Sequence, residues 1–327
     1  MRRREFIAGL GASVCPLAAW GQRVERVRRI ALLMGLDEGD PEAQRRFAAF
    51  RRTLAGFGWN DGDNVQILAR WAAGSVDDTR KYASELIGTV PDVIVVNTPI
   101  GLTALRDSTK SIPIVFVQVL DAAESAVKSA AHPGGNITGF YSFFENKMAG
   151  KWLQLLQAAS PGLKRVAVLQ NPEHPAWSSY FASIQPVAAS LGIQAIQAAV
   201  QTTNAIEQVI GRFSRERNDG LIVLPDSFTT AHRDLIVAAA NHQQIPNIAA
   251  SKSFPAAGGL MSYGADLSDL MQKAGEYVDR ILKGQRAAEL PVQASTTFEL
   301  VLNRNAARTL GLTIPLSLLA LADEVIE

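Results

Sequence analysis

Short apolar runs alternate along this chain with longer amphipathic stretches, as strands alternate with helices in an α/β protein. Residues 29–34 form the first apolar run, which ends at Gly35, and Asp40 and Pro41 follow it. Asp is a favourable helix N-cap and Pro suits the first helical position, so a helix is predicted to begin at Pro41. Three more apolar runs predict strands at residues 65–69, 92–96 and 114–117. The alternation favours parallel strands with helical connections.

The same arrangement starts over in the second half of the chain. Residues 164–169 repeat the pattern of residues 28–33 almost position for position. The later runs keep the same order, with 220–224 in the place of 92–96 and 245–248 in the place of 112–115. The chain is therefore predicted to contain two similar doubly wound domains. The candidate crossings between them lie at residues 133–139, 262–266 and 290–293.

The N-terminal segment has the three parts of a secretory signal. A basic start at residues 2–4 is followed by a weakly apolar stretch rich in Ala and Gly, and a small-x-small motif ends at Gly21. We predict a signal peptide at residues 1–21, cleaved after Gly21, and a mature protein in the periplasm. Residues 3–7 also resemble the twin-arginine export signal, and the sequence leaves the export route open. The single cysteine, Cys15, lies inside this segment, so the mature chain would have no disulfide or thiolate nucleophile.

Composition and motif spacing argue against several classes of function. Lys and Arg number 32 against 31 Asp and Glu, so no charge excess favours a nucleic-acid partner. His232 and His242 are spaced to lie on different faces of one predicted helix, which disfavours a metal site. No Gly-x-Gly pattern follows the run at residues 29–34, and no nucleophile elbow is present. We predict no catalytic residues, no metal and no cofactor, and therefore no enzyme.

The predicted architecture nevertheless locates a binding site. Ligands of open parallel sheets bind beyond the carboxyl ends of the strands, and two hinged domains would present those ends to a shared cleft. The carboxylates of Asp121 and Asp226 could pair with an ammonium group, although Asp, Asn and Ser at such places also cap helices. The candidate ligand-binding residues are the strand ends and nearby aromatic residues: Gly35, Leu36, Asp37, Asn97, Thr98, Pro99, Asp121, Asn171, Trp177, Asp226, Ser227, Phe228, Ser251 and Tyr263.

An ordered set of motifs resembles the ABC transporter substrate-binding protein family, in particular the tryptophan-binding TrpX-like proteins. The motifs are residues 1–7, 133–139, 258–264, 280–284 with 290–293, and 298–303 through 322–326. The resemblance implies a type I periplasmic binding protein, α/β in class, with two Rossmann-like doubly wound lobes joined by a three-segment hinge. The expected division is a signal at 1–21, an N-terminal lobe at 22–139 plus 266–291, and a C-terminal lobe at 140–265 plus 292–327.

The same resemblance implies an exported protein that captures a small organic ligand and delivers it to the membrane permease and ATPase of an ABC importer. Characterised relatives bind aromatic amino acids, so an amino acid is the expected ligand. Relatives commonly carry Asp-Pro after the fourth strand, whereas Ala122 follows Asp121 here. The identity of the bound compound therefore cannot be transferred from the relatives to this chain. We expect a monomer. Two alternatives remain open: an α/β enzyme on the same scaffold, or a ligand-sensing partner of a membrane receptor.

Overall fold

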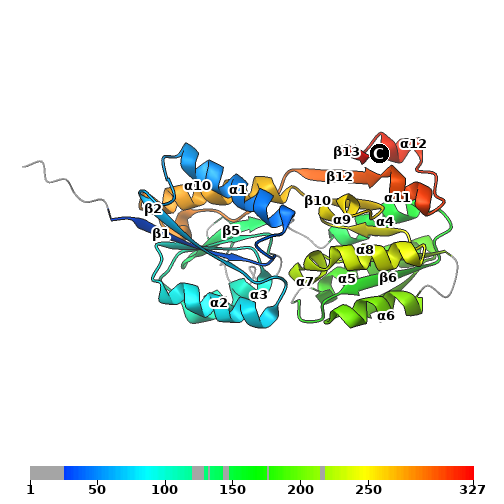
Figure 1. The fold of residues 1–327 in the computed structure, drawn as a ribbon, viewed down its shortest axis with the longest axis horizontal. Coiled ribbons are helices and arrows are strands. Elements are labelled where there is room, and N and C mark those ends of the chain that lie inside the picture. Colours follow the sequence, from blue (N-terminus) through cyan, green and yellow to red (C-terminus); the bar gives the residue numbers. More distant parts are fainter. Residues whose placement is uncertain (1–25, 120–128, 132, 143–146, 175–176, 214–217) are drawn as a thin grey trace, which may run out of the picture.

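The computed structural model describes residues 26–327, except 120–128, 132, 143–146, 175–176 and 214–217. Figure 1 shows two lobes side by side, each a sheet with helices on both faces. The predicted signal at residues 1–21 and the predicted ligand contact Asp121 lie outside the described residues. None of the helices in the described ranges has the length and apolarity that a membrane span requires.

The first lobe contains a six-stranded sheet in the order β11-β5-β4-β3-β1-β2, and every neighbouring pair is parallel. Its central strands are fully buried, because helices cover both faces of a parallel sheet. The strands are β1 (Arg28–Met34), β2 (Val65–Trp71), β3 (Val93–Val96), β4 (Ile114–Val117), β5 (Ile137–Tyr141) and β11 (Gln293–Ala294).

Two layers of helices cover this sheet. One face carries α1 (Pro41–Gly56), α10 (Leu267–Leu282) and the 3-10 helix η1 (Ala287–Glu289). The other face carries α2 (Val76–Gly88) and α3 (Pro99–Ser108). The predicted start of α1 is confirmed, because the Asp40 carboxylate accepts hydrogen bonds from the backbone N–H groups of Glu42 and Ala43.

The second lobe repeats the first. Its seven-stranded sheet has the order β13-β12-β10-β9-β8-β6-β7, in which β9-β8-β6-β7 repeats β4-β3-β1-β2. β10 and β12 pair antiparallel, and the other neighbours pair parallel. The strands are β6 (Arg165–Gln170), β7 (Gln194–Ala199), β8 (Asp219–Val223), β9 (Asn247–Ala249), β10 (Met261–Ala265), β12 (Phe298–Asn303) and β13 (Glu324–Ile326).

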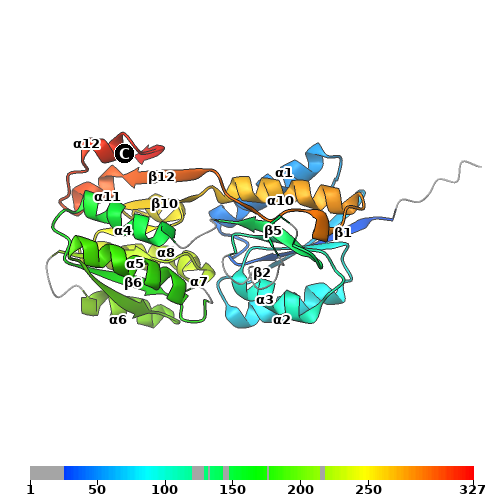
Figure 2. The same cartoon turned by 180° about the vertical axis from the view of Figure 1, so that it is seen from behind.

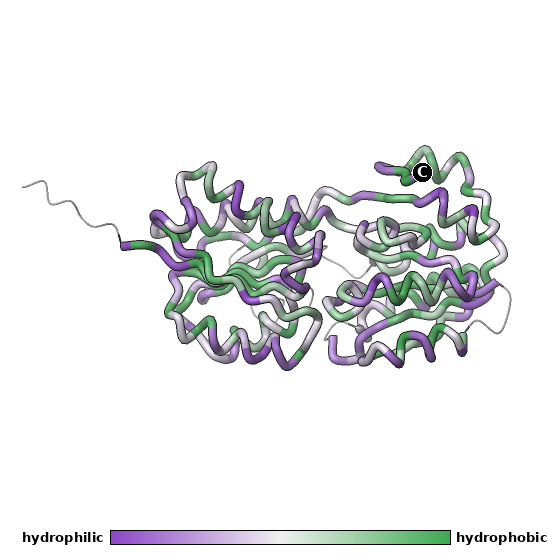
Figure 3. Tube along the Cα trace, in the orientation of Figure 1, coloured by the Kyte–Doolittle hydropathy of each residue, from purple (hydrophilic) through white to green (hydrophobic). Residues whose placement is uncertain are grey.

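Helices also cover both faces of the second sheet. One face carries α4 (Lys147–Ala159), α5 (Trp177–Leu191), α11 (Arg304–Thr309) and α12 (Leu316–Leu319). The other carries α6 (Thr203–Phe213), α8 (Arg233–His242) and α9 (Ser253–Ala256). The short helix α7 (Ser227–Ala231) follows β8 at the side facing the first lobe. Figure 3 shows the apolar residues concentrated along the strands and the polar ones along the outer helices.

The chain passes between the lobes three times: after β5, between β10 and α10, and between β11 and β12 (Figure 2). β5 and β11 belong to the first sheet, so the first and third crossings follow Tyr141 and Ala294 rather than residues 139 and 291 as predicted. Gly139 lies inside β5. A Cβ there would lie 2.1 Å from the Phe116 carbonyl oxygen, so this glycine permits two strands to approach closely.

Candidate functional site

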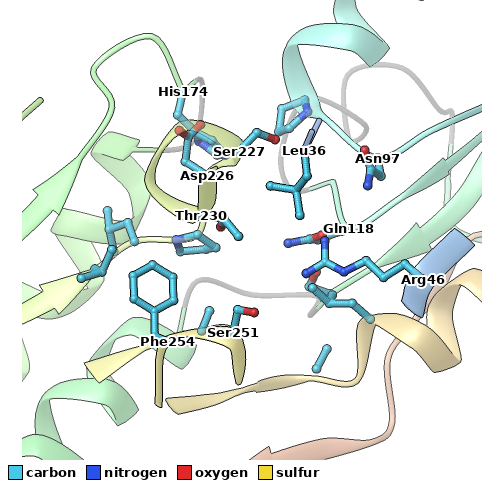
Figure 4. Close-up of a pocket in the computed structure, with 18 of the residues that line it drawn as sticks. Leu36, Arg46, Asn97, Gln118, His174, Asp226, Ser227, Thr230, Ser251 and Phe254 are labelled. Carbon is cyan, nitrogen blue, oxygen red and sulfur yellow. The ribbon is translucent and has the colours of Figure 1, made fainter. Parts of the chain in front are cut away.

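A cavity lies between the lobes, at the carboxyl ends of the two sheets (Figure 4). It encloses ≈ 780 Å³ of space between atoms, part of it open to solvent. The first lobe and the segments leading from it contribute Leu36, Arg46, Asn97, Pro99, Gln118, Ser142 and Leu267, and the second contributes His174, Tyr180, Asp226, Ser227, Thr230, Ala250, Ser251 and Phe254, among others.

Arg46 brings a buried positive charge to the first-lobe wall. Its Nε donates a hydrogen bond to Glu42 Oε1 at 2.9 Å, and the two side chains are only 5% and 4% exposed. Among the described residues its terminal nitrogens have no hydrogen-bond partner, and Figure 4 shows the guanidinium directed into the cavity. A guanidinium held at one nitrogen and open at the others is suited to a carboxylate.

Glu42 keeps that charge in place. Burial alone would raise the pKa of Glu42, but the charges of Arg46 and Arg45, and their hydrogen bonds to the carboxylate, outweigh burial and lower the pKa below its usual value. Glu42 therefore stays ionised at neutral pH. The three side chains together carry one net positive charge, and Arg46 is the member that faces the cavity.

Asp226 brings a negative charge to the second-lobe wall. Its Oδ1 caps α7 by accepting hydrogen bonds from the N–H groups of Phe228 at 2.8 Å and Thr229 at 3.3 Å. Its Oδ2 makes no hydrogen bond to any described residue. Capping and cavity lining are thus compatible here, because one oxygen serves each role.

Neutral polar groups fill the space between these charges. Asn97 follows β3, and its Oδ1 accepts a hydrogen bond from the Gly35 N–H at 2.9 Å, which fixes the amide at the cavity wall. Gln118 follows β4 with φ of 65°, a left-handed conformation that costs free energy for a residue with a side chain. The Ser142 Oγ is buried and has no hydrogen-bond partner among the described residues. Orphaned and strained polar groups at one cavity indicate a binding site.

Aromatic side chains form the apolar part of the second-lobe wall. Tyr180 comes from α5 and Phe254 from α9, and both are almost fully buried. The ring centroids of His174 and Tyr180 lie 6.1 Å apart. Such a surface can cover a flat apolar group. Within the described ranges, no group of three or more His, Cys, Asp or Glu side chains is placed to hold a metal ion.

Most of the predicted residues lie at or beside this cavity. The cavity itself is lined by Leu36, Asn97, Pro99, Asp226, Ser227 and Ser251. Three others, Thr98, Asn171 and Phe228, line a smaller recess between the lobes, and Trp177 lines a recess within the wall of the second lobe. Gly35 lies where the lobes meet, because a Cβ there would be 2.2 Å from Ser227 Oγ.

Two predicted residues lie elsewhere. Asp37 is exposed, and its carboxylate accepts a hydrogen bond from the Gly39 N–H within its own turn. Tyr263 lies in β10, and its ring packs at the edge of the second-lobe core beside Phe298, with centroids 6.1 Å apart. Side chains alternate between the faces of a strand, and Tyr263 faces the helical layer instead of the cavity.

The sequence-based prediction missed Arg46, His174, Tyr180 and Thr230 as cavity residues. Arg46 did leave a signal. Along α1 it shares the buried stripe of Phe50 and Leu54, spaced four residues apart. A charge on an apolar stripe indicates a partner or a site. The other residues lie within helices or their approaches, and no local pattern marks them.

Two sheet-and-helix lobes with three crossings and a charged cavity between them define a type I periplasmic binding protein. The chain belongs to the ABC transporter substrate binding protein family, whose model matches residues 39–326. The predicted family and fold class are thereby confirmed.

Individual relatives agree with this assignment. The tyrosine-binding protein of Clostridioides difficile (strain R20291) is 26% identical over 274 residues, which cover 83% of this chain and 78% of the relative. A conserved domain protein from Vibrio cholerae superposes with a TM-score of 0.84 at 26% identity, covering 92% of this chain and 100% of that one. A Streptococcus pneumonia ABC domain in complex with L-Trp superposes with a TM-score of 0.83 at 24% identity, covering 91% of this chain and 99% of that one. It has the same fold.

Proposed function

We propose that this protein captures an amino acid between its lobes, with the ligand carboxylate on Arg46 and the ligand ammonium on Asp226, and delivers it to an ABC importer. The observation that carries the proposal is the opposite charge of the two walls of one cavity. Arg46 offers unpaired donors, and Asp226 offers an unpaired carboxylate oxygen. A zwitterion presents the matching pair of charges.

This arrangement also supports ligand-dependent closure. Arg46 belongs to the first lobe and Asp226 to the second, so a ligand that contacts both residues stabilises the arrangement in which the lobes meet. A ligand shifts a conformational equilibrium only through contacts that differ between the two states. Contacts from both lobes are available only when the lobes are together.

The aromatic wall supports an aromatic amino acid as the ligand. Tyr180, Phe254 and His174 provide an aromatic surface beside the charged groups. The relative named as tyrosine-binding and the fold neighbour solved with L-Trp point in the same direction.

The cellular setting completes the proposal. Residues 1–21 act as the export signal, and the mature protein works as a periplasmic monomer with a permease and an ATPase as partners. It binds its ligand without converting it, since the family consists of solute-binding proteins. We place the lobes at residues 26–141 plus 267–294 and at residues 147–265 plus 298–327, following the two sheets and their helices.

The test is calorimetric titration of the chain from Gln22 with amino acids and with their amide and decarboxylated analogues. Aromatic amino acids should bind, and the analogues should bind at least about tenfold more weakly, because each loses a charge-assisted hydrogen bond. Arg46→Gln should lose affinity to the same degree. Arg45→Gln is the matched control, since Arg45 pairs with the same Glu42 but its side chain is 54% exposed.

Equal affinity for amino acids and their amides, or preference for an uncharged ligand, would contradict the proposal. Chemical conversion of the bound compound by purified protein would support an enzyme instead.

A further inference from the structure

A small recess opens beside the cavity, within the wall of the second lobe. It is lined by Gln170, Asn171, His174, Trp177, Tyr180, Leu224, Pro225 and Asp226. His174, Tyr180, Leu224, Pro225 and Asp226 also line the main cavity, so the two spaces adjoin. The lining side chains leave no room there for a water molecule, so a ligand group enters the recess only when one or more of them rotate aside.

Gln170 gives this recess an unsatisfied polar group. It is the last residue of β6 and is 2% exposed. Its Oε1 is buried and accepts no hydrogen bond from any described residue. Buried amide oxygens are nearly always paired, so this one lacks a hydrogen-bond donor that a bound ligand could supply.

The surroundings restrict what the missing donor can be. Trp177, Tyr180 and His174 make the recess largely aromatic, and the Tyr180 ring also lies 5.9 Å from the ring of Trp152. A group that enters between such rings and still donates a hydrogen bond is the polar edge of an aromatic ring, such as a phenol O–H or an indole N–H.

We propose that Gln170 determines specificity by accepting a hydrogen bond from the ring of an aromatic amino acid, so that tyrosine or tryptophan binds in preference to phenylalanine. The inference rests on the proposed function, because the α-carboxylate and α-ammonium of the ligand are assigned to Arg46 and Asp226. With those groups held, the ring lies against Tyr180 and Phe254, and its polar edge enters the recess as the lining side chains rotate aside.

Phenylalanine has the same ring without the donor. When it binds, it leaves the Gln170 oxygen unpaired, and a site built to pair a substrate hydroxyl rejects the analogue that lacks it for this reason. The loss should appear as a difference in affinity between ligands of nearly equal size.

The experiment compares Kd values of L-Tyr, L-Trp and L-Phe for the wild-type chain from Gln22, for Gln170→Met and for the control Gln194→Met. Met nearly matches Gln in shape and removes the acceptor, and Gln194 is an exposed residue of β7. The wild type and the control should bind L-Tyr or L-Trp at least about tenfold more tightly than L-Phe. In Gln170→Met this ratio should fall below about twofold, chiefly through weaker binding of the ligand with the ring donor.

The unliganded Gln170→Met variant should unfold at the same temperature as the wild type or higher, because the substitution removes an unpaired buried oxygen. A lower melting temperature with an unchanged selectivity ratio would mean that Gln170 is structural, and would overturn the inference. Equal loss of affinity for all three ligands would mean that Gln170 contacts the α-ammonium group that they share, and would also overturn the inference. Failure of the wild type to bind any of the three would reject the proposed function as well.

Discussion

Asp40 of the first lobe and Arg233 of the second form an ion pair across the interlobe boundary. One carboxylate oxygen of Asp40 caps α1, and the other accepts a hydrogen bond from the guanidinium of Arg233. The two side chains are only 8% and 13% exposed. Together with the close approach of Gly35 to Ser227, this pair shows that the lobes contact each other directly. Closure is therefore stabilised by protein contacts in addition to those that a ligand supplies.

Arg233→Gln should weaken ligand binding by about tenfold, because loss of a largely buried ion pair favours the open state, and an open protein must close before it binds. Calorimetry would give the change in affinity, and small-angle scattering of the unliganded protein should show a larger radius of gyration. Arg304→Gln is the control, since Arg304 pairs with Glu327 within the second lobe. An unchanged Kd in Arg233→Gln would show that the ion pair does not contribute to closure.

Glu42→Gln should destabilise the protein by about 3 kcal/mol at neutral pH, because it leaves the buried Arg46 without its charged partner. The pKa of Glu42 is lowered by Arg46 and Arg45, so its contribution to stability is fully present above the ordinary carboxyl pKa. That contribution is lost as the pH falls through the lowered value. The difference between variant and wild type should therefore shrink in acid, as denaturant unfolding across pH would show. Glu85→Gln, at an exposed pair with Arg70, should show no such trend.

Gly264→Ala should destabilise the second lobe by at least about 2 kcal/mol or prevent folding, because overpacking against a fixed backbone cannot relax through a rotamer change. The added Cβ would lie 2.0 Å from the Ala250 carbonyl oxygen. Gly88→Ala is the control, since nothing lies within 4 Å of its added Cβ. Thermal unfolding of the two variants would measure the difference, and equal melting temperatures would contradict the packing of β10 described above.

Tyr263→Phe should leave ligand affinity within about twofold of the wild type, because removal of a hydroxyl outside the site takes no contact from the ligand. The Tyr263 ring packs at the second-lobe core and does not line the cavity. Titration with the same ligands tests this, in parallel with Arg46→Gln. A large loss of affinity in Tyr263→Phe would restore the sequence-based assignment of Tyr263 to the site.

Local chemistry explains why much of the fold was predictable. The Asp40 cap and Pro41 fix the start of α1 with short-range hydrogen bonds and a constrained φ, and both are visible in the sequence. The parallel strands are continuous apolar runs because both faces of each sheet are covered. Strand-end residues such as Asn97 and Asp226 were found because parallel topology places all carboxyl ends at one edge.

The remainder depends on packing between distant segments. Arg46 reaches the cavity only because α1 packs against α10, where the Trp59 indole donates to Asp279 at 2.9 Å across 220 residues of sequence. The position of Tyr263 depends on which face of β10 the helices of the second lobe cover. Neither relationship has a local pattern, so the sequence could not distinguish a residue of the cleft from a residue of the core.

The position of α10 in the chain has a consequence for biosynthesis. This helix fills the core of the first lobe with Leu270, Met271, Ala274 and Val278, yet it follows nearly the whole second lobe in sequence. A ribosome therefore releases strands β1 to β5 with one apolar face covered only by α1, and adds α10 to that face only near the end of translation. A polypeptide truncated at the midpoint should expose that face and aggregate, so the first lobe cannot be produced from the first half of the gene.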